Sequence, residues 1–391
     1  MVSERSETMM EFRPLRLIHV TLGRCRIDSL HGGDISLYHF SKNLAALGHE
    51  VRYVGLTHKE PVPIPGVDTV SARRGKIPVI ASADFEQKIT EFEPDYIHFH
   101  GAYAPGNAAG ARVARRLNIP YVVTPHGNVN AEVLGRRAWI KRPYRRFFEL
   151  PMLEGARFVH AIADRKNIRE YGVTRPIEEA RNGIDLPEES EASPGREGLV
   201  RFGIPDGKRV ALFLGRLDLG QKGLDIVVDA FAKILKEFPE MHLVLAGVDW
   251  KNDQSLLREQ ISRLGIEEAV TFTGAIYGRE KEELLRDCDL FLHPSRWEAG
   301  VPFSVLEAMS YGKPVVVTED VDREGLLTGN TAVRVVAGEV DGVVDGMKSL
   351  LGLLEGKERM ISKEARALCE RHFSWRASAE RLTKAYLKHL D

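Results

Sequence analysis

The stretch that decides the fold is HPSRWEAGVPFSVLEAMSYGKP, residues 293–314, which lies between two short apolar runs. These runs, CDLFL at 288–292 and VVV at 315–317, have the length and composition of buried parallel strands. Pro302 suits the first position of a helix and Gly312 suits its end, so the stretch predicts one short helix between two strands. A strand–helix–strand unit of this kind is typical of a parallel sheet with helices on its faces.

The same alternation of strand and helix continues through the whole chain. Apolar runs alternate with segments of helical periodicity in both halves, which predicts an α/β protein whose parallel sheets are covered on both faces. Residues 187–198 have no periodicity and many turn-forming residues, so we interpret them as a linker. The linker separates two Rossmann-like, doubly wound parallel-sheet domains, 1–186 and 199–373, that would face a central cleft. The final helix, about 374–391, would suit either domain and is a candidate to pack back on the first.

The composition narrows the classes of function. The chain has 391 residues, of which 43% are apolar and 28% charged, and its formal net charge of -1 gives no field that would favour nucleic acid. Three cysteines, Cys25, Cys288 and Cys369, form no metal-binding or disulfide pattern, which fits a reducing compartment. The first residues lack the apolar core of a secretory signal, and no apolar run approaches transmembrane length. We therefore expect a cytoplasmic protein.

Candidate ligand-binding residues follow the predicted strands of both halves. In open parallel sheets, ligands bind beyond the carboxyl ends of the strands. Residues of suitable chemistry stand at this position: His100, His126, Arg216 and Glu298. The pair Gly32-Gly33 precedes a helix, where glycines let the backbone approach a phosphate, although an ordinary strand-to-helix turn explains the pair equally well. Two domains that face each other would bring these residues to one cleft.

The sharpest charge pattern is GRLDLGQKG at residues 215–223. Arg216 follows a predicted strand, and Lys222 opens the next helix. A guanidinium and an ammonium at one strand end can hold a diphosphate and neutralise the charge that develops as a diphosphate leaves. Two solvated surface cations are the plainer interpretation, but the position at a ligand-binding edge favours the diphosphate site.

Two carboxylates flank the loop at 298–301. Backbone amides at a helix N-terminus have no intrahelical acceptor and attract anions. Glu298 lies in the loop and Glu307 lies more than a turn into the helix, so we expect them to contact different parts of one ligand rather than to act as a glycosidase pair. A surface charge is the alternative for Glu307, but its place between Leu306 and Ala308 predicts an inward position that needs a partner. An anion-binding loop with carboxylates for hydroxyl groups suits a sugar nucleotide.

Histidines suggest a metal site only weakly. His98 and His100 alternate on one predicted strand and share a face, and His126 is a third candidate. A metal ion would need more ligands of suitable geometry, so we interpret these residues as strand-end histidines that line a cleft and predict no bound metal.

One segment is strongly basic. RRAWIKRPYRRFF at residues 136–148 contains six cations and four aromatic residues, a pattern that suits an anionic membrane surface. An amphipathic helix with its aromatics in the core and its arginines outside, bent at Pro143, is the simpler interpretation.

Together these motifs resemble the group 1 (family 4) retaining glycosyltransferases of the GT-B fold. The likeness extends from Gly32-Gly33 to Phe373-Ser-Trp375 and so covers most of the chain. Each motif is weak alone, and the combination is specific. The motifs are, in order, GGD at 32–34 with LGHEV at 47–51, TPHG at 124–127, NGID at 182–185, GRL at 215–217 with KG at 222–223, and PS at 294–295 with Glu298, LEAM at 306–309 and GKPVV at 312–316.

The resemblance implies transfer of a hexose from a nucleotide-diphosphate sugar to an acceptor, with retention of configuration and generally without a metal or other cofactor. The N-terminal domain would form the acceptor side and the C-terminal domain the donor side. In this family the acceptor is usually proposed to attack from the side of the leaving group, with a phosphate oxygen as the base. The activity implied here belongs to the synthesis of a cell-surface polysaccharide or glycolipid. The basic segment at 136–148 hints at a lipid-linked acceptor and at peripheral contact with the inner membrane face.

The resemblance also implies a role for individual residues. Arg216 and Lys222 would hold the donor diphosphate, and Glu307 would bind the nucleotide ribose. Sugar hydroxyl groups would be held by Glu298 and by the loop amides. The catalytic residues implied are Arg216, Lys222, Glu298 and His126, which would lie beside the sugar. The remaining residues implied in donor binding are Gly32 and Gly33, near the phosphates, and the amides of Gly300 and Val301.

The sequence departs from the family pattern in one place. The family usually spaces its two glutamates as E-x7-E, whereas one more residue separates Glu298 from Glu307 here, and the loop reads AGVP instead of GFG. The LEAM context supports Glu307. If the extra residue turned Glu298 away, the amides of Gly300 and Val301 would carry the sugar contact.

Other classes of function are compatible with parts of this pattern. A nucleotide-sugar epimerase of the same fold would keep the donor site, and so would a nucleotide-sugar-binding protein without turnover. A nicotinamide-dependent oxidoreductase fits the sheet, but the chain lacks the full G-x-G-x-x-G pattern, and such an enzyme would not explain Arg216 and Lys222.

Overall fold

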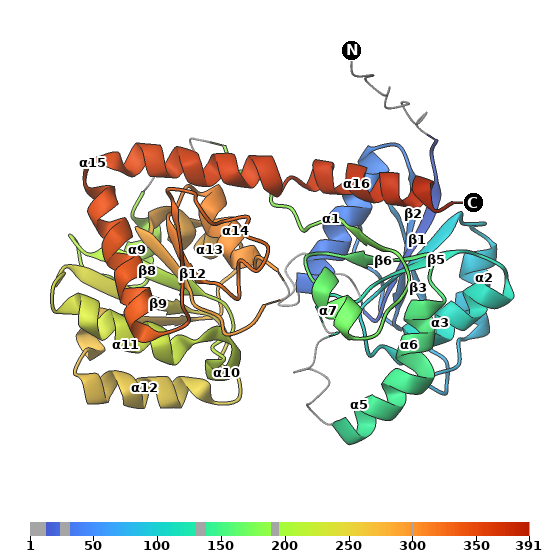
Figure 1. Cartoon of the computed structure of the whole chain (residues 1–391), viewed down its shortest axis with the longest axis horizontal. Helices are drawn as coiled ribbons and strands as arrows, with labels where there is room; N and C mark the ends of the chain where they lie inside the picture. Colours follow the sequence, from blue (N-terminus) through green and yellow to red (C-terminus); the bar gives the residue numbers. More distant parts are fainter. Residues whose placement is uncertain are drawn as a thin grey trace, which may run out of the picture.

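The computed structural model describes residues 13–23, 32–127, 129, 138–188, 195–298 and 300–390. The described residues form two α/β halves, each built on a parallel sheet, which lie side by side (Figure 1). Two helices at the C-terminal end extend across both halves. The predicted fold class, two doubly wound parallel-sheet domains, is therefore confirmed.

The N-terminal sheet has seven parallel strands in the order β3-β2-β1-β4-β5-β6-β7. The strands are β1 (Arg16–Thr21), β2 (Glu50–Leu56), β3 (Asp68–Ala72), β4 (Tyr96–His100), β5 (Tyr121–Thr124), β6 (Phe158–Ala161) and β7 (Ile177–Glu179). The helices are α1 (Gly32–Ala46), α2 (Ala83–Thr90), α3 (Pro105–Arg116), α5 (Ala138–Tyr144), a π-helical turn (Arg145–Glu149), α6 (Leu150–Glu154) and α7 (Arg165–Glu170). The central strands are buried on both faces, because apolar clusters cover each side of the sheet.

The C-terminal sheet has six parallel strands in the order β10-β9-β8-β11-β12-β13. The strands are β8 (Arg209–Leu214), β9 (Met241–Ala246), β10 (Val270–Gly274), β11 (Leu290–His293), β12 (Val315–Thr318) and β13 (Val333–Val336). The helices are α9 (Glu197–Arg201), α10 (Leu219–Lys222), α11 (Leu224–Leu235), α12 (Asp253–Leu264), a 3-10 turn (Glu267–Ala269), α13 (Gly278–Asp287) and α14 (Phe303–Ser310).

The stretch at 293–314 folds as its pattern predicts. β11 and β12 pair in parallel, and α14 connects them. Pro302 stands one residue before the helix, at its N-cap, and Gly312 has the positive φ of 74° that suits a helix end. The apolar face of α14 is fully buried, so this unit belongs to the core of the C-terminal half.

Three local expectations need correction. Strand β3 was not predicted, because its sequence DTVSA is short, half polar and at the sheet edge. The amphipathic helix expected over the basic segment at 136–148 is interrupted: α5 passes through a π-helical turn into α6, and Pro143, which lacks a backbone donor, lies two residues before the turn. Helix α9 begins inside the predicted linker 187–198, of which 189–194 lie outside the described residues, as do 136 and 137.

The C-terminal helices connect the two halves. α15 (Val340–His372) is interrupted at Glu355–Gly356, where Gly356 has a φ of 86°. α16 (Trp375–Lys388) then packs on α1 and β7 of the N-terminal half. Its buried side chains, Trp375 and Tyr386 among them, complete the apolar cluster on one face of the N-terminal sheet.

Trp375→Ala is expected to reduce the free energy of unfolding by about 3–5 kcal/mol, the usual cost of removing a buried aromatic side chain. Trp375 is buried, and its indole stacks on the ring of His39 in α1, with ring centroids 4.6 Å apart. Urea denaturation would measure the change. Trp139→Ala, at a tryptophan that is 79% exposed, is the matched control and should change the free energy by less than about 0.5 kcal/mol. Equal losses in both variants would contradict this assignment of α16.

Candidate active site

A cavity of about 670 Å³ lies between the two halves, at the carboxyl ends of both sheets. Residues from both halves line it, including those that follow β5, β8 and β11. All the residues that the sequence nominated for donor binding and catalysis lie on its wall: Gly32, Gly33, His126, Arg216, Lys222, Glu298, Gly300, Val301 and Glu307. Tertiary structure therefore collects at one place residues that are up to 275 positions apart, from 32 to 307.

Lys222 and Glu298 form an ion pair inside the cavity. The Lys222 Nζ contacts Glu298 Oε1, and each side chain is 11% exposed. Lys222 is held in place by the residue after it: Gly223 has a φ of 64°, and any side chain there would collide with the carbonyl group of Pro294. Glycine at 223 is therefore what allows α10 to approach the loop that carries Glu298.

Two further contacts orient Glu298. Ser295 Oγ donates to Glu298 Oε1 at 2.8 Å, and His293 Nε2 lies 3.3 Å from the same oxygen. Burial alone would raise the pKa of Glu298, but Lys222 and His293 outweigh it and lower the pKa to about 2. Glu298 is therefore a carboxylate at neutral pH. The longer spacing to Glu307 does not remove it from the cavity.

Arg216 is held by groups that carry no charge. Its guanidinium lies over the ring of Trp250, 4.5 Å from the centroid, and its Nη2 donates to Gln221 Oε1 at 3.0 Å. Within the described part of the chain, no carboxylate lies within ion-pair distance of Arg216. The positive charge of Arg216 is therefore available to an anionic ligand.

Glu307 has the partner that its inward position predicted. Lys281 Nζ, from α13, lies 2.7 Å from Glu307 Oε1 in α14, and both residues line the cavity. Lys281 was not nominated from the sequence. It follows the carboxyl end of β10, so the rule that selected Arg216 could have found it, but no recognisable motif surrounds it.

The N-terminal wall of the cavity is a turn after β5. His126 and Gly127 both have positive φ, 52° and 72°, and the Gly127 amide donates to Asp164 Oδ2 at 3.2 Å. Gly33 lies beside the ring of His126, and a methyl group added there would meet that ring at an ordinary contact distance of 3.5 Å. The steric space at Gly33 thus does not demand glycine, and close approach of its backbone to a phosphate stays a prediction.

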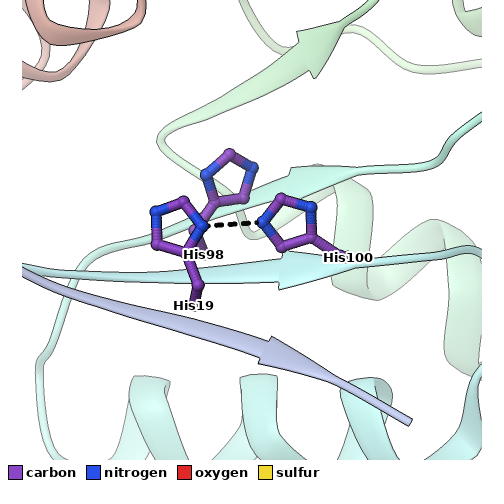
Figure 2. Close-up of side chains that lie close together, drawn as sticks. All are labelled: His19, His98 and His100. Atoms are coloured by element: carbon purple, nitrogen blue, oxygen red, sulfur yellow. Dashed lines mark hydrogen bonds between the residues drawn. The ribbon is translucent and has the colours of Figure 1, made fainter. Parts of the chain in front are cut away.

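The positions of the histidines differ in part from the prediction that His98, His100 and His126 all line a cleft. His100 and His126 line the cavity, but His98 is fully buried in the sheet and does not reach it. The structure adds His19, which faces His98 across the β1–β4 pair. His19, His98 and His100 are shown in Figure 2; among the described residues they form the one group of three or more side chains of metal-ligating type with converging ligand atoms.

The basic segment also differs from its simpler interpretation, which placed the aromatics in the core. Trp139 and Phe147 are 79% and 63% exposed, and Ile140 is exposed beside them. Arg142 and Arg146 are exposed on the same segment. Tyr144 and Phe148 stack on each other and are half-buried. An apolar and basic surface is therefore open to solvent on α5 and the turn after it.

Two family models match this chain. Residues 30–188 match "Glycosyltransferase Family 4", and residues 208–352 match "Glycosyl transferases group 1". This chain belongs to the group 1, family 4 glycosyltransferases.

Relatives and solved structures agree with this family. The glycosyltransferase is 27% identical to the phosphatidyl-myo-inositol mannosyltransferase of Mycobacterium leprae over 328 residues, which are 83% of this chain and 81% of that protein. Its structure is similar to sucrose-phosphate synthase from Thermosynechococcus elongatus, with a TM-score of 0.74, 18% identity and coverage of 95% and 98% of the two chains. It is also similar to Anabaena HepE in complex with UDP and glucose, with a TM-score of 0.72, 17% identity and coverage of 95% and 99%. The fold is thus that of GT-B glycosyltransferases.

Lys222→Ala is expected to lower the turnover of the glycosyltransferase by about 10²–10³-fold, the usual loss when one preorganised charge contact to a developing anion is removed. Release of nucleoside diphosphate from the sugar donor would measure it. Lys348→Ala is the matched control, because Lys348 also pairs with a glutamate, Glu237, but on the surface and away from the cavity. Near-normal turnover of the Lys222 variant would refute a role for this ammonium in binding the diphosphate.

Proposed function

We propose that this glycosyltransferase transfers a hexose from a nucleotide-diphosphate sugar to an acceptor with retention of anomeric configuration. The observation that carries the proposal is the arrangement of charge in the cavity. Arg216 offers a cation that has no carboxylate partner among the described residues, and Lys222 offers a second one beside a carboxylate that can accept hydrogen bonds. Similarity to a protein solved with UDP and glucose supports a donor of this class.

The diphosphate and the sugar of the donor would each contact a different part of this cavity. Arg216 and Lys222 would bind the diphosphate, and Glu298, with the amides of Gly300 and Val301, would accept and donate hydrogen bonds to the sugar hydroxyl groups. Glu307, held by Lys281, would bind the ribose. Three cations around one cavity supply the positive charge that a metal ion would otherwise bring to the leaving group, so we propose that the transfer needs none.

Retention is supported by the weak basicity of the carboxylate nearest to the cations. A general base works best when its pKa lies near the working pH. The pKa of Glu298 is about 2, because Lys222 and His293 outweigh the effect of burial, so this carboxylate would take a proton from an acceptor poorly. An oxygen of the leaving diphosphate is the better base, and it lies on the same face as the bond that breaks. Attack from that face retains the configuration.

A lipid-linked acceptor, and peripheral contact with an anionic inner membrane face, fit the exposed surface of α5. Trp139, Ile140 and Phe147 expose apolar side chains next to exposed arginines, the combination that binds at a lipid interface. Within the described residues, no helix is long and apolar enough to cross a membrane. The related mannosyltransferase of Mycobacterium leprae is named for a phosphatidylinositol acceptor. Such an acceptor would place the enzyme in the synthesis of a glycolipid or a cell-surface polysaccharide.

Thermal unfolding with UDP, GDP, ADP and their common sugar conjugates, each with Mg²⁺ or with a chelator, is expected to show stabilisation by one diphosphate and its conjugate, unaffected by the chelator. The anomeric configuration of the product, read by NMR from a labelled donor, should equal that of the donor. Stabilisation by NAD(P)H alone would replace the proposal with an oxidoreductase. An isomerised nucleotide sugar without transfer to an acceptor would show an epimerase instead.

Arg142→Ser/Arg146→Ser is expected to weaken binding to vesicles of phosphatidylglycerol and phosphatidylcholine by about 30-fold, from roughly 1 kcal/mol for each cation near an anionic surface. Sedimentation with the vesicles would measure it, and vesicles of phosphatidylcholine alone should bind both proteins weakly. Arg263→Ser/Arg359→Ser, at two exposed arginines of the other half, is the matched control. Unchanged binding of the first variant would remove the membrane contact from the proposal.

A further inference from the structure

A cluster of five histidines, four of them buried and the fifth, His126, half-buried at the cavity wall, crosses the N-terminal sheet. They come from β1, β4, β6 and the turn after β5: His19, His98, His100, His160 and His126. Those on the strands lie on the sheet face that α1 and α16 cover, and Tyr386 of α16 reaches them through a 2.5 Å contact between its hydroxyl group and His98 Nδ1. Proximity to the donor site does not by itself explain why so many imidazoles are buried together.

None of these rings is charged near neutral pH. Burial, with some repulsion from His160, lowers the pKa of His19 and His126 to about 3. Burial and the neighbouring histidines lower the pKa of His98 and His100 well below the ordinary value. Each ring is therefore a neutral imidazole with one N–H donor and one acceptor nitrogen.

A metal site fits this group poorly. His19 Nδ1 and His100 Nε2 already lie at hydrogen-bond distance, 3.1 Å, from each other. Both nitrogens of His98 are also occupied already, one by Tyr386 and the other by Thr124 Oγ1 at 2.6 Å. Hydrogen bonding describes the group better.

Three of the rings form a hydrogen-bonded row that starts at the cavity. His126 Nε2 lies 3.0 Å from His100 Nδ1, and His100 Nε2 lies 3.1 Å from His19 Nδ1, the contact drawn in Figure 2. At the far end, His19 Nε2 is buried and has no hydrogen-bond partner in the described part of the chain. The row thus has one end in the ligand cavity and the other at a nitrogen without a partner.

The nitrogen without a partner, His19 Nε2, determines the direction in which the hydrogen bonds of the row donate. If His19 carried its hydrogen on Nε2, the row would bury an N–H group without an acceptor, which proteins tolerate less well than a buried acceptor without a donor. The hydrogen of His19 is better placed on Nδ1, which then donates to His100 Nε2. His100 in turn carries its hydrogen on Nδ1 and donates to His126 Nε2. His126 is left with its own hydrogen on Nδ1.

We propose that His100 and His19 are positioning residues that hold His126 in the tautomer with the hydrogen on Nδ1, so that this N–H donates to an oxygen atom of the sugar donor. The Nδ1 atom of His126 is the ring nitrogen that the row leaves free, and it lies near Gly33 on the cavity wall. The turn of His126 and Gly127, with positive φ at both residues and a bond to Asp164, fixes the base of the ring. The identity of the oxygen that accepts this hydrogen bond rests on the proposed function. The tautomer of His126 rests only on the hydrogen bonds of the row.

¹⁵N NMR of protein with labelled histidine tests the tautomer directly, because the nitrogen that bears the hydrogen has a distinct chemical shift. His126 is assigned by the signal that disappears in His126→Asn. Wild-type protein without ligand should show the hydrogen on Nδ1, and His100→Phe should shift the population toward Nε2. His100→Asn should restore the wild-type signal, since its amide nitrogen can take the place of Nδ1 as a donor.

Kinetics and a control separate positioning from folding. His100→Phe should lower kcat/KM by about tenfold, the value of one neutral hydrogen bond, and His100→Asn should recover most of it. His49→Phe is the matched control, because His49 is a buried histidine of the same half that bonds Thr383 and Leu15 and lies outside the row. It should lower thermal stability and leave the His126 signal unchanged.

Three results would overturn the proposal: hydrogen on Nε2 of His126 in the wild type, a His126 signal that His100→Phe does not change, or stoichiometric Zn²⁺ binding that His19→Phe abolishes. The first two results would show that His100 and His19 do not hold His126 in the tautomer with hydrogen on Nδ1. The third would show that the cluster binds a metal ion instead. The NMR readout needs no substrate, so its outcome is independent of the sugar-transfer assays. A correct tautomer together with no transfer from any nucleotide sugar would refute the proposed function alone.

Discussion

Every strand in both halves runs parallel to its neighbours, and the rest of the structure depends on this constraint. Parallel strands need crossover connections, so their carboxyl ends emerge together at one edge of each sheet. The loop after β5 carries His126, the loop after β8 carries Arg216, and the loop after β11 carries Glu298. Because the two edges face the same cavity, residues with no contact in sequence become parts of one site.

Charge inside this cavity is balanced before any ligand arrives. A partly buried ion without a partner is costly, and the pairs Lys222–Glu298 and Lys281–Glu307 avoid that cost. Pairing also holds long side chains in one orientation, which limits the entropy lost when a ligand binds. Arg216 is the exception, and the ring of Trp250 supports it without neutralising it. The cavity therefore combines two prearranged ion pairs with a cation, Arg216, that no carboxylate of the described residues neutralises.

The last helix ties the two halves together and also supports the cavity wall. α16 follows α15 from the C-terminal half and buries Trp375 and Tyr386 on the N-terminal sheet. Through Tyr386 it contacts His98, whose ring stacks on that of His100 with centroids 4.3 Å apart. A helix that is remote in sequence from every strand-end motif is thus packed against the histidines behind the cavity.

The sequence by itself determined most of the elements and most of the candidate residues, because both depend on local patterns. Apolar periodicity, with a proline at the start and a glycine at the end, predicted the short helix α14 between two strands. Only the tertiary structure showed that Lys281 pairs with Glu307 and that His19 joins the histidine row. These two residues stand in no motif. Their roles arise from contacts across sheets and helices, where strand register and packing, rather than sequence spacing, decide which side chains meet.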